Sequence, residues 1–214
     1  MERVFKIAKR INHFKVAAGL HPKPVPVAPY GNYFEAVLRE YTIDDHLQLQ
    51  EMVAKEVEQT GFESSELKNL VFYSTVQILI EPYRQSFLKT FDNNAWKREI
   101  CPFCGRNAGV ALLPEEGVKK LVCQLCWTEW DYPRLKCFCC GKDSNGYALF
   151  EIDNREVRVD YCDSCKMYIK TFIFEHSEDP YPILDLKTLQ LDNWAKEKGY
   201  KKPTPTLVGI DFSK

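Results

Sequence analysis

The fold is decided by residues 101–165, which read CPFCGRNAGVALLPEEGVKKLVCQLCWTEWDYPRLKCFCCGKDSNGYALFEIDNREVRVDYCDSC. All nine cysteines of the 214-residue chain lie inside this stretch. Eight of them form four Cys-x-x-Cys pairs, which begin at Cys101, Cys123, Cys137 and Cys162. Such clustering is typical of metal sites in a reducing compartment and not of scattered disulfides. The sequence therefore predicts a metal-binding protein of the cytoplasm.

The cysteine stretch contains an internal repeat. The third pair begins 36 residues after the first, and the fourth begins 39 residues after the second. In each copy a cysteine knuckle is followed by a hairpin and a second knuckle, with turn residues at 114–117 and at 153–154. We expect a first metal-binding module over residues 98–136 and a second over residues 137–175. Both resemble the hairpin modules of rubredoxins and zinc ribbons.

The spacing of the pairs predicts which cysteines share a metal ion. Two thiolates three residues apart on a tight turn can reach one ion, and the hairpin brings a second such turn opposite. Adjacent pairs are therefore expected to share a site, with interleaved pairing as the alternative. The predicted ligands are Cys101, Cys104, Cys123 and Cys126 in site 1, and Cys137, Cys140, Cys162 and Cys165 in site 2. Zinc and a single iron suit four sulfurs equally.

Other candidates for chemistry are few. Two sites closed by protein ligands are structural or electron-transferring and leave no position for hydrolysis. The ninth cysteine, Cys139, is either a spare buried residue, a competitor of Cys140 for the metal, or a reactive thiol beside the site. The four histidines do not cluster, and no Ser/His/Asp set, phosphate loop or carboxylate pair is evident. We expect no enzymatic activity.

Charge and hydropathy limit the partners. The chain has a net charge of −1, and residues 101–165 hold 8 Lys and Arg against 10 Asp and Glu. This balance, with metal-bound thiolates added, disfavours nucleic acid. The longest apolar-looking run, over residues 70–80, is too short to cross a membrane. The aromatic residues Trp130 and Tyr132 are expected in the core or at a protein interface and not as base-stacking groups.

The flanking sequence is of a different kind. Apolar residues at helical spacing predict an N-terminal helical domain over residues 1–95, with a proline-rich connector at 21–30. The first segment is interpreted as an amphipathic helix, with a mitochondrial transit peptide as the less favoured alternative. A C-terminal helix is expected over 183–199. The predicted fold class is α+β, with tandem hairpin modules between helical segments.

Several of these motifs together resemble one family. They are the four pairs in order, the segment from Trp130 to Cys137, the Tyr168-x-Lys170 motif and the C-terminal helix ending in Gly199-Tyr200. This combination, over about residues 98–200, is similar to the formate dehydrogenase accessory proteins of the FdhE family. Members of that family carry a larger N-terminal part.

The resemblance implies a cytoplasmic maturation factor that binds the catalytic subunit of a formate dehydrogenase. It also implies iron in rubredoxin-like sites held by the eight paired cysteines. No nucleic acid and no membrane insertion are expected, and a homodimer is compatible with this role. Two alternatives remain at this stage, namely a zinc-ribbon adaptor of a transcription or translation assembly and a small rubredoxin-like electron carrier.

Overall fold

The fold is taken from a computed structural model. It describes residues 77, 80–81, 84–114, 117–143, 146–174, 179 and 181–206. The helical domain expected over residues 1–95, with its connector at 21–30, lies mostly outside the described residues, although residues 84–88 are helical. Residues 92–102 and 106–206 fall within one compact unit, which contains all the named strands and helices.

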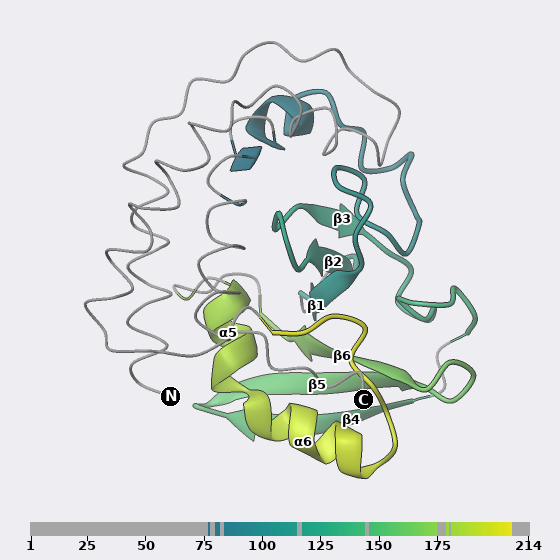
Figure 1. Ribbon diagram of the computed structural model, residues 1–214, viewed down its shortest axis with the longest axis vertical. Coiled ribbons are helices and arrows are strands. Elements are labelled where there is room, and N and C mark those ends of the chain that lie inside the picture. Colours follow the sequence, from purple (N-terminus) through teal and green to yellow (C-terminus); the bar gives the residue numbers. More distant parts are fainter. Residues whose placement is uncertain are drawn as a thin grey trace, which may run out of the picture. The chain divides into compact units, whose positions relative to one another are not determined.

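The centre of this unit is a six-stranded sheet with the strand order β3-β2-β1-β6-β5-β4 (Figure 1). The strands are β1 (Ala108–Leu112), β2 (Lys120–Cys123), β3 (Glu129–Asp131), β4 (Gly146–Ile152), β5 (Arg155–Cys162) and β6 (Met167–Phe172). Neighbouring strands are antiparallel except β1 and β6, which pair in parallel. The two modules are therefore not independent domains, because this parallel pair joins them into one sheet.

Each module contributes three strands where the sequence pattern predicted a two-stranded hairpin. After the second knuckle of each module the chain returns along the hairpin, as β3 beside β2 and as β6 beside β5. The third strand aligns Trp130 with Leu121, and Tyr168 with Tyr161. Trp130 is fully buried, so its role is in the core.

The hairpin of the second module turns where the sequence predicts. Ile152 of β4 pairs with Arg155 of β5, which leaves Asp153 and Asn154 as a two-residue turn. Both turn residues have positive φ, 51° and 58°, as a type I′ turn requires. Aspartate and asparagine adopt this conformation more readily than other side chains that carry a Cβ. The turn therefore fixes the register of the longest strand pair.

Two helices follow the sheet, α5 (Tyr181–Lys187) and α6 (Leu189–Glu197). The single helix expected over 183–199 is thus divided at Thr188, whose φ of −112° and ψ of 26° are not helical. The Thr188 hydroxyl donates a hydrogen bond to the Leu184 carbonyl at 2.8 Å, which stabilises the end of α5. Gly199, with φ of 84°, follows α6 as the predicted stop.

The core lies between the sheet and these helices. Its buried members are Val110, Leu112, Val122, Val157, Val159, Tyr168, Phe172, Leu184, Leu191 and Ala195. Trp194 of α6 meets Phe150 of β4 edge to face, with 5.1 Å between ring centroids, so α6 lies over the β4–β6 half of the sheet (Figure 1).

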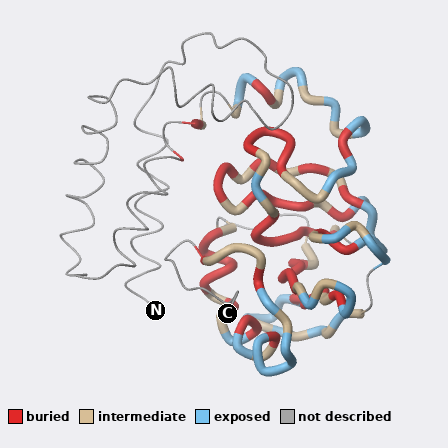
Figure 2. Tube along the Cα trace, turned by 45° about the vertical axis from the view of Figure 1, so that its right-hand side comes forward, coloured by how far each residue is buried: buried red, intermediate tan, exposed pale blue. Residues whose placement is uncertain are grey.

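Burial falls off from the middle of the sheet toward its β4 edge. Every residue of β1 is buried, and so are five of the six in β6, whereas β4 alternates between half-buried and exposed residues (Figure 2).

The mixed α+β class is confirmed. Among the described residues, no helix has the length and apolar character needed to span a membrane.

Candidate metal centres

The structure brings the paired cysteines together in two groups. The four sulfur atoms of site 1 all lie within 4.8 Å of one another, and so do the four of site 2. These groups correspond to the adjacent pairing of knuckles within each module. In both modules the second strand of the hairpin ends at the first cysteine of the second knuckle, Cys123 or Cys162. The strands thus place the knuckles opposite each other.

The sulfur separations fit a tetrahedral metal site. In a tetrahedron with metal–sulfur bonds of about 2.3 Å, the sulfurs lie about 3.8 Å apart. The Cys101 and Cys126 sulfurs are 3.5 Å apart. In site 2 the sulfurs of Cys137 and Cys165 are 3.7 Å apart, and those of Cys140 and Cys162 are 3.8 Å apart. These distances far exceed the length of a disulfide bond.

Each knuckle ends in the same unusual backbone conformation. The residue after the second cysteine of every pair has a positive φ between 57° and 72°, and these residues are Gly105, Trp127, Gly141 and Lys166. In three knuckles the amide of this residue donates to the carbonyl of the first cysteine, as Lys166 does to Cys162 at 2.8 Å. The glycines signal this turn in the sequence. The second knuckle of each module has no such signal, since Trp127 and Lys166 stand at this position.

The two sites differ in their exposure to solvent. All four cysteines of site 1 are buried. In site 2, Cys137 and Cys162 are buried, whereas Cys165 is half-buried and Cys140 is exposed. A reagent in solution therefore has access to site 2 that it lacks to site 1.

The metal-free thiols of site 2 have unequal acidities. Burial raises the pKa of Cys165 to about 12. Burial alone would also raise the pKa of Cys162, but the backbone amides of Cys165 and Ser164 hydrogen-bond its sulfur and lower the pKa to about 7. Since metals bind thiolates, metal binding at site 2 must displace the proton of Cys165.

Cys139 stands at the tip of the third knuckle, beside site 2. Its backbone amide donates a hydrogen bond to the Cys137 sulfur at 3.4 Å. Its side chain is half-buried. Burial raises the pKa of the Cys139 thiol, and the neighbouring sulfurs of Cys137 and Cys140 raise it further. Site 2 therefore has a fifth thiol at its margin.

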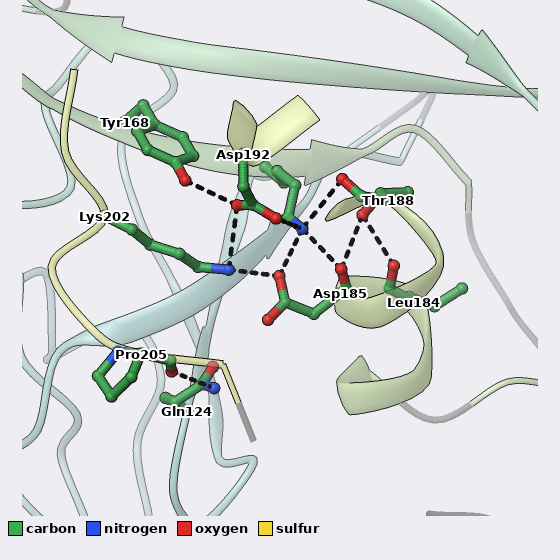
Figure 3. Close-up of polar contacts among 9 residues, drawn as sticks. Gln124, Tyr168, Leu184, Asp185, Thr188, Asp192, Lys202 and Pro205 are labelled. Carbon is green, nitrogen blue, oxygen red and sulfur yellow. Dashed lines mark hydrogen bonds and ion pairs between the residues drawn. The ribbon is translucent and has the colours of Figure 1, made fainter. Parts of the chain in front are cut away.

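A buried ion network lies on the helix side of β6 (Figure 3). The Lys170 ammonium contacts carboxylate oxygens of Asp185 at 2.7 Å and of Asp192 at 2.6 Å. Lys202, from the segment after α6, reaches the same two carboxylates, Asp185 at 2.5 Å. The Tyr168 hydroxyl donates to Asp192 at 2.7 Å. The four charged residues are buried, with two charges of each sign.

The sequence alone does not predict that the residues of this ion network meet. In the sequence, Tyr168 and Lys170 stand out only as a motif of the family resemblance. Two residues apart on a strand, they share one face. The aspartates lie seven residues apart, a spacing that a single continuous helix would have placed on one face. Lys202 gives no signal in the sequence, since it follows a turn and meets the carboxylates only through the fold.

The chain is similar to proteins of the FdhE family. Residues 135–208 match the family model described as FdhE, C-terminal domain. The Protein FdhE homolog of Aquifex aeolicus is 31% identical over 176 residues, covering 75% of this chain and 61% of that protein. The homolog of Shewanella oneidensis is 34% identical over 118 residues, covering 50% and 37%. The chain thus spans less than two thirds of the length of either relative.

A solved structure shows the same fold. The crystal structure of the FdhE protein from Pseudomonas aeruginosa matches this chain with a TM-score of 0.54 and 20% identity. The match covers 95% of this chain and 70% of that one.

Proposed function

Because this chain is FdhE-like in sequence and in fold, we propose that it is a cytoplasmic accessory protein in the maturation of formate dehydrogenase. It binds the catalytic subunit of that enzyme and has no catalytic activity of its own. The family match and the two complete four-thiol clusters, found in the same chain, support this function.

We further propose that the eight paired cysteines hold two metal ions. The cysteines of site 1 belong to both knuckles of the first module, and those of site 2 to both knuckles of the second. A bound ion ties the two knuckles of a module together and, if it is iron, can also exchange one electron. Four sulfurs accept zinc as well, so the donor set supports metal binding without selecting the metal.

The shared β-sheet presents a surface for the client next to the two metal sites. The two modules share one sheet through β1 and β6, so the surfaces near site 1 and site 2 keep a fixed relation within it. No observation favours the zinc-ribbon adaptor or the electron carrier over the accessory role.

The test is capture of the client from cells of the source organism grown under conditions that induce formate metabolism. Tagged wild-type chain should retain a formate dehydrogenase catalytic subunit, identified by mass spectrometry. Replacing Cys101 and Cys104 by serine should abolish this capture, because site 1 then lacks two ligands. Cys139→Ser is the matched control: it also removes a thiol from a knuckle, but it spares all eight predicted ligands, so capture should persist under reducing conditions.

Two results would contradict the proposal. One is recovery of RNA polymerase or ribosomal proteins without formate dehydrogenase, which would support the adaptor. The other is equal capture of the client by the wild type and by the double serine variant, which would remove site 1 from the interaction. Metal content of every preparation is measured alongside, so that loss of capture can be assigned to loss of the metal.

A further inference from the structure

Residues 200–206, here named the strap, follow α6 and contact a cysteine knuckle of each metal site. At the start of the strap the Tyr200 hydroxyl donates a hydrogen bond to the Asp163 carboxylate at 3.0 Å. Near its end the Pro205 carbonyl accepts a hydrogen bond from the Gln124 side-chain amide at 2.9 Å (Figure 3). Asp163 and Gln124 each directly follow the first cysteine of the second knuckle in their module. One short segment therefore joins the second knuckles of both sites.

The two contacts are equivalent in the internal repeat. Gln124 and Asp163 are 39 residues apart, which is also the offset between the second knuckles of the two modules. A chance contact of the strap with the sheet would have no reason to involve the same repeat position twice. Each module thus presents the same knuckle position to the strap.

The strap is also held between its two ends. The Lys201 amide donates to the Lys166 carbonyl at 2.8 Å, and the Lys201 carbonyl accepts from the Tyr168 amide at 3.0 Å. Lys202 is buried in the ion network. The two prolines of the strap have no amide donor and disfavour a helix, which favours an extended chain between the two knuckles. A short extended segment held at both ends transmits the loss of one end contact to the rest of its length.

We propose that the strap responds to metal at both sites. It is docked while both second knuckles are folded around an ion, and it is released when either site is empty. A structural metal site owes its fold to the bound ion, so an empty site loses the knuckle that holds its end of the strap. The docked strap therefore marks a chain that carries two ions. The inference rests on the metal-binding part of the proposed function and does not depend on the identity of the client.

The experiment measures amide hydrogen exchange by NMR on the full chain loaded with two zinc ions, with the Lys201 amide as the reporter of docking. Gln124→Met keeps the side-chain length and removes the donor to Pro205. We expect this variant to retain both zinc ions and to exchange the Lys201 amide about five-fold faster, as the loss of one hydrogen bond implies. Gln85→Met is the matched control, because the Gln85 amide donates to the Glu81 carboxylate at an exposed position. It should leave Lys201 exchange unchanged.

Removal of the ion from site 1 alone tests the response to metal. The variant with Cys101 and Cys104 replaced by serine keeps the ligands of site 2 and the whole strap. We expect its Lys201 amide to exchange about five-fold faster or more than in wild type. The factor should exceed that of the Val159 amide in β5, because the sheet of the second module stays in place while the strap is released.

Three results would overturn the proposal. One is unchanged exchange of Lys201 in Gln124→Met. Another is an equal increase for Lys201 and Val159 in the serine variant, which would assign the effect to the shared sheet. The third is loss of zinc from Gln124→Met, since Gln124 would then support the site and not the strap. Zinc content, measured first on wild type, separates a failure of metal binding from a failure of the strap. Because no client is present, failure of the capture experiment leaves the exchange result standing.

Discussion

At the scale of single residues, the knuckles depend on a left-handed backbone conformation at one position each. Gly141 adopts it with φ of 68°, and a Cβ at this position would overlap the Glu99 carboxylate. In Lys166 the same conformation carries a full side chain. The knuckle conformation can therefore carry a Cβ, whereas at Gly141 a Cβ would also require the end of the Glu99 side chain to move.

We predict that Gly141→Ala weakens zinc binding at site 2 and lowers the free energy of unfolding by about 1 kcal/mol or more, because the left-handed conformation disfavours a Cβ. Zinc affinity is measured by chelator competition, and stability by urea unfolding. Gly199→Ala is the matched control, since Gly199 also has positive φ (84°) but open space around it. It should lose similar stability without losing zinc affinity. Equal effects of both substitutions on zinc would contradict this account.

A second prediction concerns the buried Lys202. Lys202→Met removes a cation that contacts the buried Asp185 and Asp192 carboxylates, and unpaired buried charge costs about 3–5 kcal/mol. Lys136→Met is the control, because Lys136 pairs with Asp143 at the exposed surface and should change stability by less than about 1 kcal/mol. Urea unfolding of zinc-saturated protein separates the two. Similar losses in both variants would show that the buried network does not stabilise the fold.

At the scale of elements, the ion network fastens the segment after α6 to the sheet. Lys201 forms a parallel bridge with Met167 at the start of β6 and donates its amide to the Lys166 carbonyl at 2.8 Å. Lys202 then enters the network beneath the helices. The turn that closes the last knuckle of site 2 is thus held by the segment after α6.

This arrangement predicts a pH dependence of stability. Burial alone would raise the pKa of Asp185, but Lys170 and Lys202 hold it below the ordinary value. A lowered folded-state pKa stabilises the protein above the unfolded pKa of about 3.9, and this stabilisation is lost as the pH falls through the folded value. Wild type should therefore exceed Asp185→Asn in free energy of unfolding at pH 7, and the difference should shrink below about pH 4.

Measuring the difference between the two proteins in matched buffers cancels the loss of metal in acid, which both share. Urea midpoints at pH 7, 5 and 3.5 suffice to test the trend. A gap that stays constant or widens toward low pH would contradict the assigned role of Asp185.

At the scale of the whole molecule, the two metal sites are parts of one sheet. Val110 to Leu112 of β1 pair in parallel with Lys170 to Phe172 of β6. In addition, Lys119 of the first module forms a buried ion pair with Asp160 of the second at 2.6 Å. The folded structure of each module therefore stabilises that of the other.

We predict energetic coupling between the sites. The variant with Cys101 and Cys104 replaced by serine should bind one zinc, at site 2, with lower affinity than site 2 has in wild type. The reason is that the disordered first module no longer supports β6 through β1. Chelator competition measures the affinity, and the serine replacement of Cys162 and Cys165 gives the reciprocal comparison. Independent affinities in both variants would show that the modules fold separately despite their shared sheet.

Much of the site could be predicted from the sequence because its signals are local. The pair spacing and the repeat of 36 and 39 residues selected the eight cysteines and their grouping by module. Asp153 and Asn154 fixed a turn by their own backbone preferences, and Gly141 signalled a knuckle. Each of these signals depends on neighbours within a few residues, so a single sequence contains it.

Features that depend on distant partners were decided only by the tertiary structure. The joining of two modules through β1 and β6 has no local signal, because the central strands are buried on both faces and lack the alternation that marks a hairpin. The break at Thr188 and the burial of Lys202 likewise depend on partners remote in the chain. The sequence by itself determined the ligand pattern and the module, because these signals are local, whereas the packing of the helices and the segment after them on the sheet decided which charges are buried.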